Sequence, residues 1–158
     1  MRGDYPNALS AAQRAVAASP NLASAYSNLA IVLIYSGRHR DGLTALDTCF
    51  TLNPRVPDSA SHLNHRAAAL YFCREYDAAI QTIKNVMHFY PGYPHPYRWR
   101  AASLGQLGRI DEAREALEKA VTIAPAVFDL YVRQRAPWLR PEDHTHMLDG
   151  LRKAGWEG

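Results

Sequence analysis

Apolar residues recur every three or four positions along most of this chain, a spacing that places them on one face of an α-helix. The helical stretches come in blocks, and the blocks close on four prolines: Pro20, Pro54, Pro91 and Pro125. These prolines are 34, 37 and 34 residues apart, a period typical of stacked helix–turn–helix units. The pattern therefore predicts an all-α chain of repeated helix pairs.

Equivalent positions in the blocks hold residues of similar size. Two columns hold small residues where helices are expected to cross, because only a hydrogen or a methyl lets two backbones approach closely. These columns are Ala30, Ala67 and Ala101, then Gly42, Ala79 and Ala113. Gly37 and Gly108 are expected to turn the chain after a first helix, where the middle block has Arg74. The N-caps predicted for the second helices are Asp41, Asp77 and Asp111.

These columns resemble those of the tetratricopeptide repeat (TPR) family, most closely between residues 96 and 125. The resemblance covers about residues 3–125 and implies a TPR-type α-solenoid, a right-handed superhelix of antiparallel helix pairs with C-terminal capping helices. We expect a single domain over residues 1–158. Its parts are a half repeat (1–20), three complete repeats (21–54, 55–91 and 92–125) and a C-terminal cap (126–158), with three extra residues of the middle repeat in the loop 54–59.

Both ends of the chain depart from the repeat. The helix expected from Pro6 to Ser19 matches only the second half of a unit, so that its Leu9, Ala12 and Val16 would lack a partner helix. Two explanations stay open: the chain is part of a longer protein, or this edge pairs with a second copy. At the other end, residues 126–135 and 141–154 are expected to form two helices that cover the last repeat.

The first helices of such repeats line a concave groove, and the resemblance implies that a protein or peptide binds there. The family's groove columns correspond to eight residues here: Asn28, Ile31, Tyr35, Asn64, His65, Tyr71, Arg98 and Gln106. No lysine lies in a first helix, which argues against the carboxylate clamp of chaperone-type members. Tyrosines, amides and an arginine instead suit a peptide with mixed apolar and polar contacts. Whether Tyr71 and Phe72 belong to the groove or to the core is open.

The end of the chain carries a second resemblance. The stretch from Pro137 to Gly158, PWLRPEDHTHMLDGLRKAGWEG, is similar to the C-terminal end of proteobacterial class III adenylate and guanylate cyclases. In those proteins a TPR region follows the catalytic domain. The resemblance implies a regulatory or scaffold region of a larger bacterial signalling protein, with any catalytic activity in a domain outside this chain. The alternative is a stand-alone, homodimerising TPR adaptor.

Charge and composition narrow the class of partner. The net charge is only +3, and no segment concentrates lysine and arginine, so we expect no nucleic-acid partner. The longest apolar run, from Leu29 to Tyr35, is far shorter than a membrane span, and the start has no apolar signal-peptide core. Cys49 and Cys73 fall inside predicted helices as packing residues. We therefore expect a cytoplasmic protein without a membrane partner.

Seven histidines raise the alternative of a metal-binding or enzymatic module. His62 and His65 share a helix face, yet no carboxylate or thiol stands at helical spacing beside them, and zinc needs three or four ligands. His144 and His146 are two residues apart and point to different faces. We predict no metal site, no cofactor and no catalytic residue in this chain.

Overall fold

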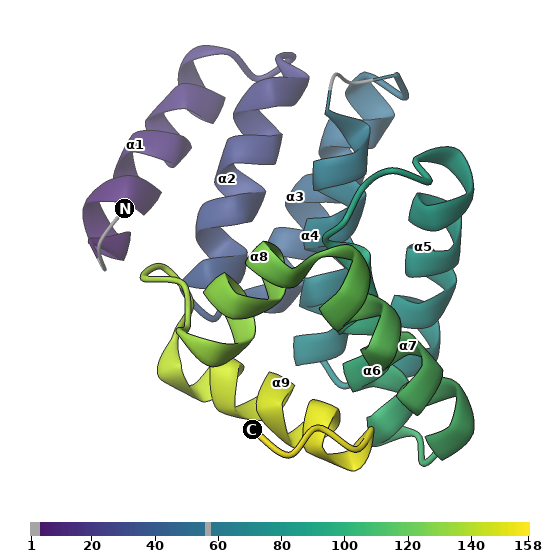
Figure 1. The fold of residues 1–158 in the computed structure, drawn as a ribbon. Helices are drawn as coiled ribbons and strands as arrows, with labels where there is room; N and C mark the ends of the chain where they lie inside the picture. Colours follow the sequence, from purple (N-terminus) through teal and green to yellow (C-terminus); the bar gives the residue numbers. More distant parts are fainter. Residues whose placement is uncertain (1–3, 56–57) are drawn as a thin grey trace.

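The computed structural model describes residues 4–55 and 58–158, which form helices joined mostly by short turns (Figure 1). The main helices are α1 (Tyr5–Ala18), α2 (Ala23–Tyr35), α3 (His39–Leu52), α4 (Ser59–Phe72), α5 (Tyr76–Phe89), α6 (Pro96–Gln106), α7 (Ile110–Ile123) and α9 (Pro141–Lys153). A short helix, α8 (Pro125–Phe128), continues into a π-helical turn, η1 (Asp129–Arg133). Neither described range contains a strand, so the all-α prediction is confirmed.

Three antiparallel helix pairs make up the body of the described chain, as can be followed in Figure 1. Within the pairs, α2 packs against α3, α4 against α5, and α6 against α7. The pairs stack in sequence order, because α3 contacts α4 and α5 contacts α6. α1 packs against α2 and takes the place of the second helix of a preceding pair. The predicted loop at 54–59 and half repeat at 1–20 lie partly outside the described residues.

Small residues lie where the helices of a pair cross. The alanines of the two predicted columns are fully buried: Ala30, Ala67, Ala101, Ala79 and Ala113. Gly42 shows why their size matters, since a Cβ there would lie 2.5 Å from Ile34 Cγ1 and 3.1 Å from the Ala30 carbonyl oxygen. Close approach of the two helices therefore depends on the absence of side-chain volume at these positions.

A residue in left-handed backbone conformation follows the first helix of each pair. Gly37 has a φ of 90° and Gly108 a φ of 71°, values that glycine adopts at no steric cost. Arg74 takes the equivalent position with a φ of 63°. The N-cap prediction is wrong, because the second helices begin earlier than expected. The predicted caps lie inside the first helical turn, where a carboxylate favours the positive end of the helix dipole: Asp41, Asp77 and Asp111.

The C-terminal segment, residues 126–158, takes a path that the sequence did not indicate. The helix predicted over 126–135 is replaced by the end of α8 and the π-helical turn η1. The chain then has positive φ at Arg135 (59°), and α9 runs crosswise to the first helices (Figure 1). α9 packs mainly against α6, so the segment covers the inner side of a first helix as well as following the last pair.

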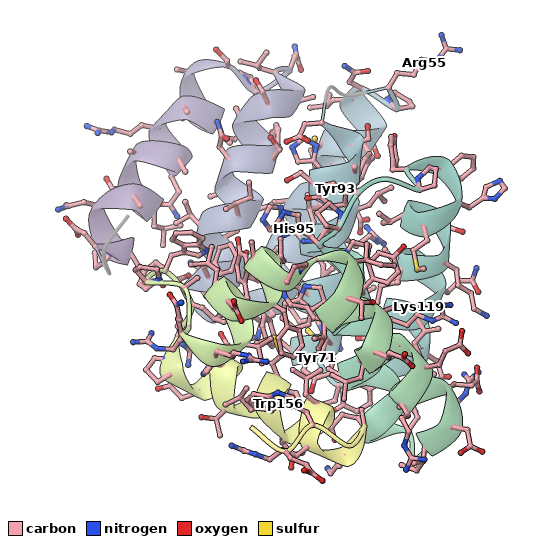
Figure 2. The ribbon with its side chains drawn as sticks, viewed as in Figure 1. Arg55, Tyr71, Tyr93, His95, Lys119 and Trp156 are labelled. Atoms are coloured by element: carbon pink, nitrogen blue, oxygen red, sulfur yellow. The ribbon has the colours of Figure 1, made fainter. Side chains whose placement is uncertain are left out.

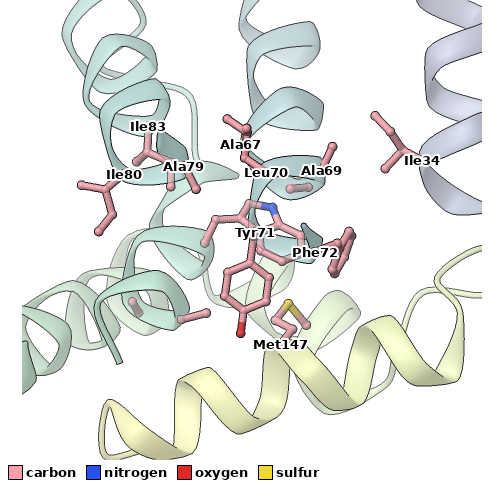
Figure 3. Close-up of a cluster of buried hydrophobic side chains, with 14 of the residues drawn as sticks. Ile34, Ala67, Ala69, Leu70, Tyr71, Phe72, Ala79, Ile80, Ile83 and Met147 are labelled. Carbon is pink, nitrogen blue, oxygen red and sulfur yellow. The ribbon is translucent and has the colours of Figure 1, made fainter. Parts of the chain in front are cut away.

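The core runs between the helices of the pairs and continues under this C-terminal segment. Tyr71 and Phe72 of α4 meet Met147 of α9 in its centre (Figure 3). Trp99, Tyr71 and Met147 are almost completely buried. Among the described helices, none has the length and apolar character needed to cross a bilayer.

Candidate functional site

The predicted groove residues divide by their exposure. The buried ones are Tyr35, Asn64, Tyr71 and Arg98, and the half-buried ones are Ile31, His65 and Gln106. Asn28 is exposed. Tyr71 is 0% and Phe72 8% exposed, so both are core residues. The C-terminal segment contacts many of these side chains, and it divides the predicted groove into a filled part and a remaining pocket.

The filled part surrounds Tyr71, which is labelled in Figure 2. The Tyr71 hydroxyl donates a hydrogen bond of 2.7 Å to the carbonyl oxygen of His146 on α9, and burial raises its pKa. Gln106 donates to the Tyr71 hydroxyl (3.2 Å) and to an Asp149 carboxylate oxygen (3.0 Å). Lys153 donates to the Gln106 side-chain oxygen at 2.8 Å. Two predicted partner-binding residues are therefore engaged by α9 of the same chain.

α9 can approach α6 closely because a glycine lies on each helix where the two cross. A Cβ on Gly105 of α6 would lie 2.1 Å from the carbonyl oxygen of Gly150 on α9. A Cβ on Gly150 would lie 2.6 Å from the carbonyl oxygen of Ala102. Each contact would involve backbone atoms, which cannot rotate away. The sequence contains both glycines, but nothing in the repeat pattern pairs them.

The other end of the C-terminal segment is held near α1 and the start of α3. The Tyr5 hydroxyl of α1 donates to the carbonyl oxygen of Trp138. His39 Nε2 lies 3.1 Å from a carboxylate oxygen of Asp143, which is only 6% exposed. Arg140 Nη1 lies 3.9 Å from the same carboxylate. The segment thus spans the inner side from the first described helix to the third pair.

A pocket of about 290 Å³ remains between α2, α4 and the C-terminal segment. Its walls are mostly aromatic and come from two parts of the chain: Ile31, Tyr35, His65, Tyr131 and Trp138. The Tyr35 and His65 rings stand edge to face, 5.7 Å apart, and the Tyr131 and Trp138 rings are 6.0 Å apart. The family columns located Ile31, Tyr35 and His65, but they missed Tyr131 and Trp138. The only sequence signal for Tyr131 and Trp138 is that they are aromatic residues in the proline-containing segment after the last repeat.

Arg98 lies directly behind the Tyr131 wall. Its guanidinium carbon is 4.1 Å from the centre of the Tyr131 ring and 5.0 Å from that of Trp99. One of its terminal nitrogens donates to the His95 carbonyl oxygen at 2.9 Å. Arg98 is 3% exposed, and burial lowers its pKa, although a guanidinium keeps its charge at neutral pH.

Burial also controls the histidines beside Arg98. It lowers the pKa of His65 to about 4, and the nearby charges of His62 and Arg98 add to this shift. Burial and the Arg98 charge lower the pKa of His95, which lies above α8 with Tyr93 in Figure 2. Both rings are therefore neutral at pH 7, which suits an apolar pocket wall better than a charged one.

The other histidines are dispersed over different contacts. His144 Nε2 lies 2.9 Å from the carbonyl oxygen of Val132, and His146 Nε2 lies 2.9 Å from the Tyr76 hydroxyl. Within residues 4–55 and 58–158, no three side chains of the metal-ligating types gather into a candidate metal site. Cys49 is buried and Cys73 half-buried, and both are free thiols.

The predicted oligomer edge on α1 lies against α2. Ala12 is buried, while Leu9 and Val16 are half-buried, and Leu9 packs against the main core. The fully exposed side of α1 carries small residues, among them Ala11 and Ala15. The three predicted residues therefore do not form a bare apolar face in the described chain. Homodimerisation itself stays a prediction, which sedimentation of the purified protein would test.

Comparison with known proteins agrees with the repeat architecture. A model of the tetratricopeptide repeat matches residues 99–127, which lie at the third helix pair and the start of α8. No curated protein sequence matches the chain.

Several solved structures share the fold. MamA from Desulfovibrio magneticus RS-1 superimposes with a TM-score of 0.69 at 19% identity, covering 98% of this chain and 85% of that chain. TTC0263, a thermophilic TPR protein in Thermus thermophilus, gives a TM-score of 0.66 at 25% identity, covering 85% of this chain and 73% of that chain. YrrB, described as a TPR protein with an unusual peptide-binding site, gives 0.62 at 14% identity, covering 96% and 76%. The fold is thus a TPR-type α-solenoid, as the sequence predicts.

Proposed function

We propose that this chain is a protein–protein interaction module that binds a peptide or a partner domain on its concave side. The observation that carries the proposal is the aromatic pocket of about 290 Å³ between α2, α4 and the C-terminal segment. TPR solenoids build extended concave surfaces rather than catalytic centres, and YrrB, which has the same fold, is described as having an unusual peptide-binding site. Peptide ligands commonly insert one apolar anchor side chain into such a pocket.

The pocket is the part of the predicted groove that the C-terminal segment leaves open. Around Tyr71 and Gln106, α9 already takes up the polar groups that a peptide would use. At the pocket, Ile31 and His65 are half-buried and keep exposed surface. A partner therefore gains buried apolar area here without displacing α9.

Panning a phage-displayed library of random twelve-residue peptides against the purified chain tests this proposal. We expect an enriched consensus whose synthetic peptides bind, and Ile31→Glu should weaken that binding at least tenfold by placing a charge in the pocket wall. Thr44→Glu is the matched control, because Thr44 is exposed on α3. Both variants should keep the helical circular dichroism. Absence of any enriched peptide, or full binding by Ile31→Glu, would reject the proposal.

We further propose that the module serves as the regulatory or scaffold region of a larger bacterial signalling protein in the cytoplasm, such as a nucleotide cyclase. The support is the similarity of residues 137–158 to the C-terminal ends of class III cyclases. In the test, the purified chain is added to a proteobacterial class III adenylate cyclase catalytic domain while cyclic AMP formation is measured. We expect a saturable change in rate that Ile31→Glu removes. An unchanged rate would reject the cyclase context and leave the binding proposal standing.

A further inference from the structure

Arg98 is a buried cation without an acidic partner. The side chain is 3% exposed, and burial lowers its pKa. The titratable groups that act in the other direction are three tyrosines and no carboxylate: Tyr35, Tyr131 and Tyr93. No ion pair joins it to an aspartate or glutamate of the described chain. A buried charge is costly unless it is paired, so proteins normally place a carboxylate beside a buried guanidinium. Among the described residues, no carboxylate takes that position beside Arg98.

The hydrogen bonds of Arg98 are also incomplete. A guanidinium has five N–H donors. One terminal nitrogen donates to the His95 carbonyl oxygen at 2.9 Å and lies 3.5 Å from His95 Nδ1. The buried Nε has no acceptor among the residues that the structure describes. Asp58, an acid whose charge acts on His65 and Tyr93, is not among the groups that act on Arg98. Within the described residues, the guanidinium Nε therefore has no acceptor.

One half-buried ring separates this cation from the pocket. Tyr131 lines the pocket on one side and stacks on Arg98 on the other, at 4.1 Å. Tyr131 belongs to the π-helical turn η1, and such turns are frequent at functional sites. A ligand that enters beside Tyr131 would meet the apolar rings of the pocket, with the guanidinium directly behind the Tyr131 ring.

We propose that the pocket binds an acidic–hydrophobic peptide segment of a partner protein. In that segment an Asp or Glu carboxylate pairs with Arg98, and a neighbouring bulky apolar side chain enters between Tyr35 and Trp138. The inference rests on the proposed function and adds the chemistry of the partner. The volume is sufficient, because a cavity of about 150 Å³ already accepts a benzene ring and this one has about 290 Å³.

The charge balance of the site predicts proton uptake on binding. The Arg98 charge contributes to the lowered pKa of both His65 and His95. A carboxylate beside Arg98 offsets that charge, so the pKa of each ring should rise when the acidic peptide binds. His62 also lowers the pKa of His65, while Asp58 and the Ser61 carbonyl raise it. These groups belong to the chain and stay in place in both states.

The experiment compares matched peptides on the wild type. Library-selected sequences are synthesised with acetylated and amidated ends, each beside a counterpart in which the acidic residue is replaced by its amide. Titration followed by tryptophan fluorescence, to which Trp138 contributes, should give at least tenfold tighter binding for the acidic member. Binding of the acidic peptide should also be accompanied by proton uptake on the histidine rings near pH 5.5, measured calorimetrically in two buffers of different ionisation enthalpy.

Arg98→Met separates this role from a structural one. We expect the variant to bind both members of each pair equally, and to melt at the same or a higher temperature because a buried unpaired charge is removed. Equal binding of both members by the wild type would overturn the inference, as would a preference that appears only when the peptide has a free C-terminal carboxylate. In both cases, loss of all binding in Ile31→Glu would leave the proposed function intact. If Arg98→Met does not fold, the proton uptake of the wild type is the deciding measurement. Absence of proton uptake when the acidic peptide binds would contradict the inference.

Discussion

The first and second helices of the pairs differ in how much of their surface is buried. α2, α4 and α6 each bury eight residues. Their partners α3, α5 and α7 bury five, four and four. A helix that faces a core on one side only buries one stripe, as the second helices do. The first helices are enclosed on two sides because each packs against its own partner and against the second helix that precedes it, and α9 of the C-terminal segment covers α6 as well.

α6 shows how little of this difference is visible in its own composition. Its sequence, PYRWRAASLGQ, is rich in polar residues, yet Arg98 and Ser103 are buried with the apolar side chains. α7 has a clear apolar stripe and many charges, as an outer helix should. The apolar pattern of the repeats therefore predicts which residues make contact within a helix pair. Burial of the inner side depends on a segment that lies outside the repeats.

The largest expected effect comes from the core contact between the C-terminal segment and the first helices. Met147 of α9 is 0% exposed, so Met147→Ala should lower the free energy of unfolding by about 3 kcal/mol through lost apolar contact and a cavity. Met87 on α5 is half-buried, and Met87→Ala should cost about 1 kcal/mol. Urea unfolding followed by circular dichroism measures both. Similar losses would mean that the C-terminal segment does not seal the inner side.

The glycine crossing should give the next largest effect. Alanine normally stabilises a helix relative to glycine by about 1 kcal/mol. Gly105→Ala should instead cost about 2–3 kcal/mol, because its Cβ would lie 2.1 Å from a backbone oxygen of α9. Gly92→Ala is the control, since nothing lies within 4 Å of a Cβ there. Hydrogen exchange should also show faster exchange of α9 amides in Gly105→Ala. A stabilised Gly105→Ala would contradict the close crossing.

The sequence predicts the helix pairs well because the contacts within a pair join nearby residues at fixed spacing. Gly37, Gly108 and the buried alanine columns follow directly from that local order. The path of the C-terminal segment depends on contacts such as Tyr71 with His146 and Tyr5 with Trp138, which are 75 and 133 residues apart. No periodicity encodes such pairs. The same holds for the pocket, of which the sequence could predict only one wall. Ile31, Tyr35 and His65 come from repeat columns, whereas Tyr131 and Trp138 of the other wall do not.

Acid should lower the stability of the folded chain more through the buried histidines of the inner side than through the exposed histidines of the outer side. Burial lowers the pKa of His65 to about 4, so the unfolded chain binds a proton that the folded chain does not. The contribution of neutral His65 to the stability of the folded chain is complete above the unfolded pKa of about 6.5. It is lost as the pH falls toward 4, because protonation then favours the unfolded chain. Between pH 7 and pH 5 this loss amounts to about 2 kcal/mol.

Urea unfolding of His65→Gln at pH 7 and pH 5 measures that contribution. The difference in unfolding free energy between the two pH values should shrink by about 2 kcal/mol relative to the wild type. The matched variant is His88→Gln, because His88 is exposed on α5. It should keep the wild-type difference. An unchanged difference in His65→Gln would place the acid sensitivity elsewhere, for example at His146 or His144, whose pKa values burial also lowers.

The smallest expected difference in stability is between substitutions of two polar residues, one on each side of the turn between α6 and α7. Gln106 of α6 bonds to Tyr71 of α4 and to Asp149 and Lys153 of α9, so Gln106→Ala should cost about 1 kcal/mol. Arg109 pairs with Glu112 at 2.7 Å on the exposed start of α7, and Arg109→Ala should cost only a few tenths of a kcal/mol. Added salt should reduce the Arg109 effect and leave the Gln106 effect largely unchanged, because solvent-exposed charges are screened most. If Arg109→Ala proves the more costly, side-chain bonding to α9 contributes less to the inner side than its apolar packing does.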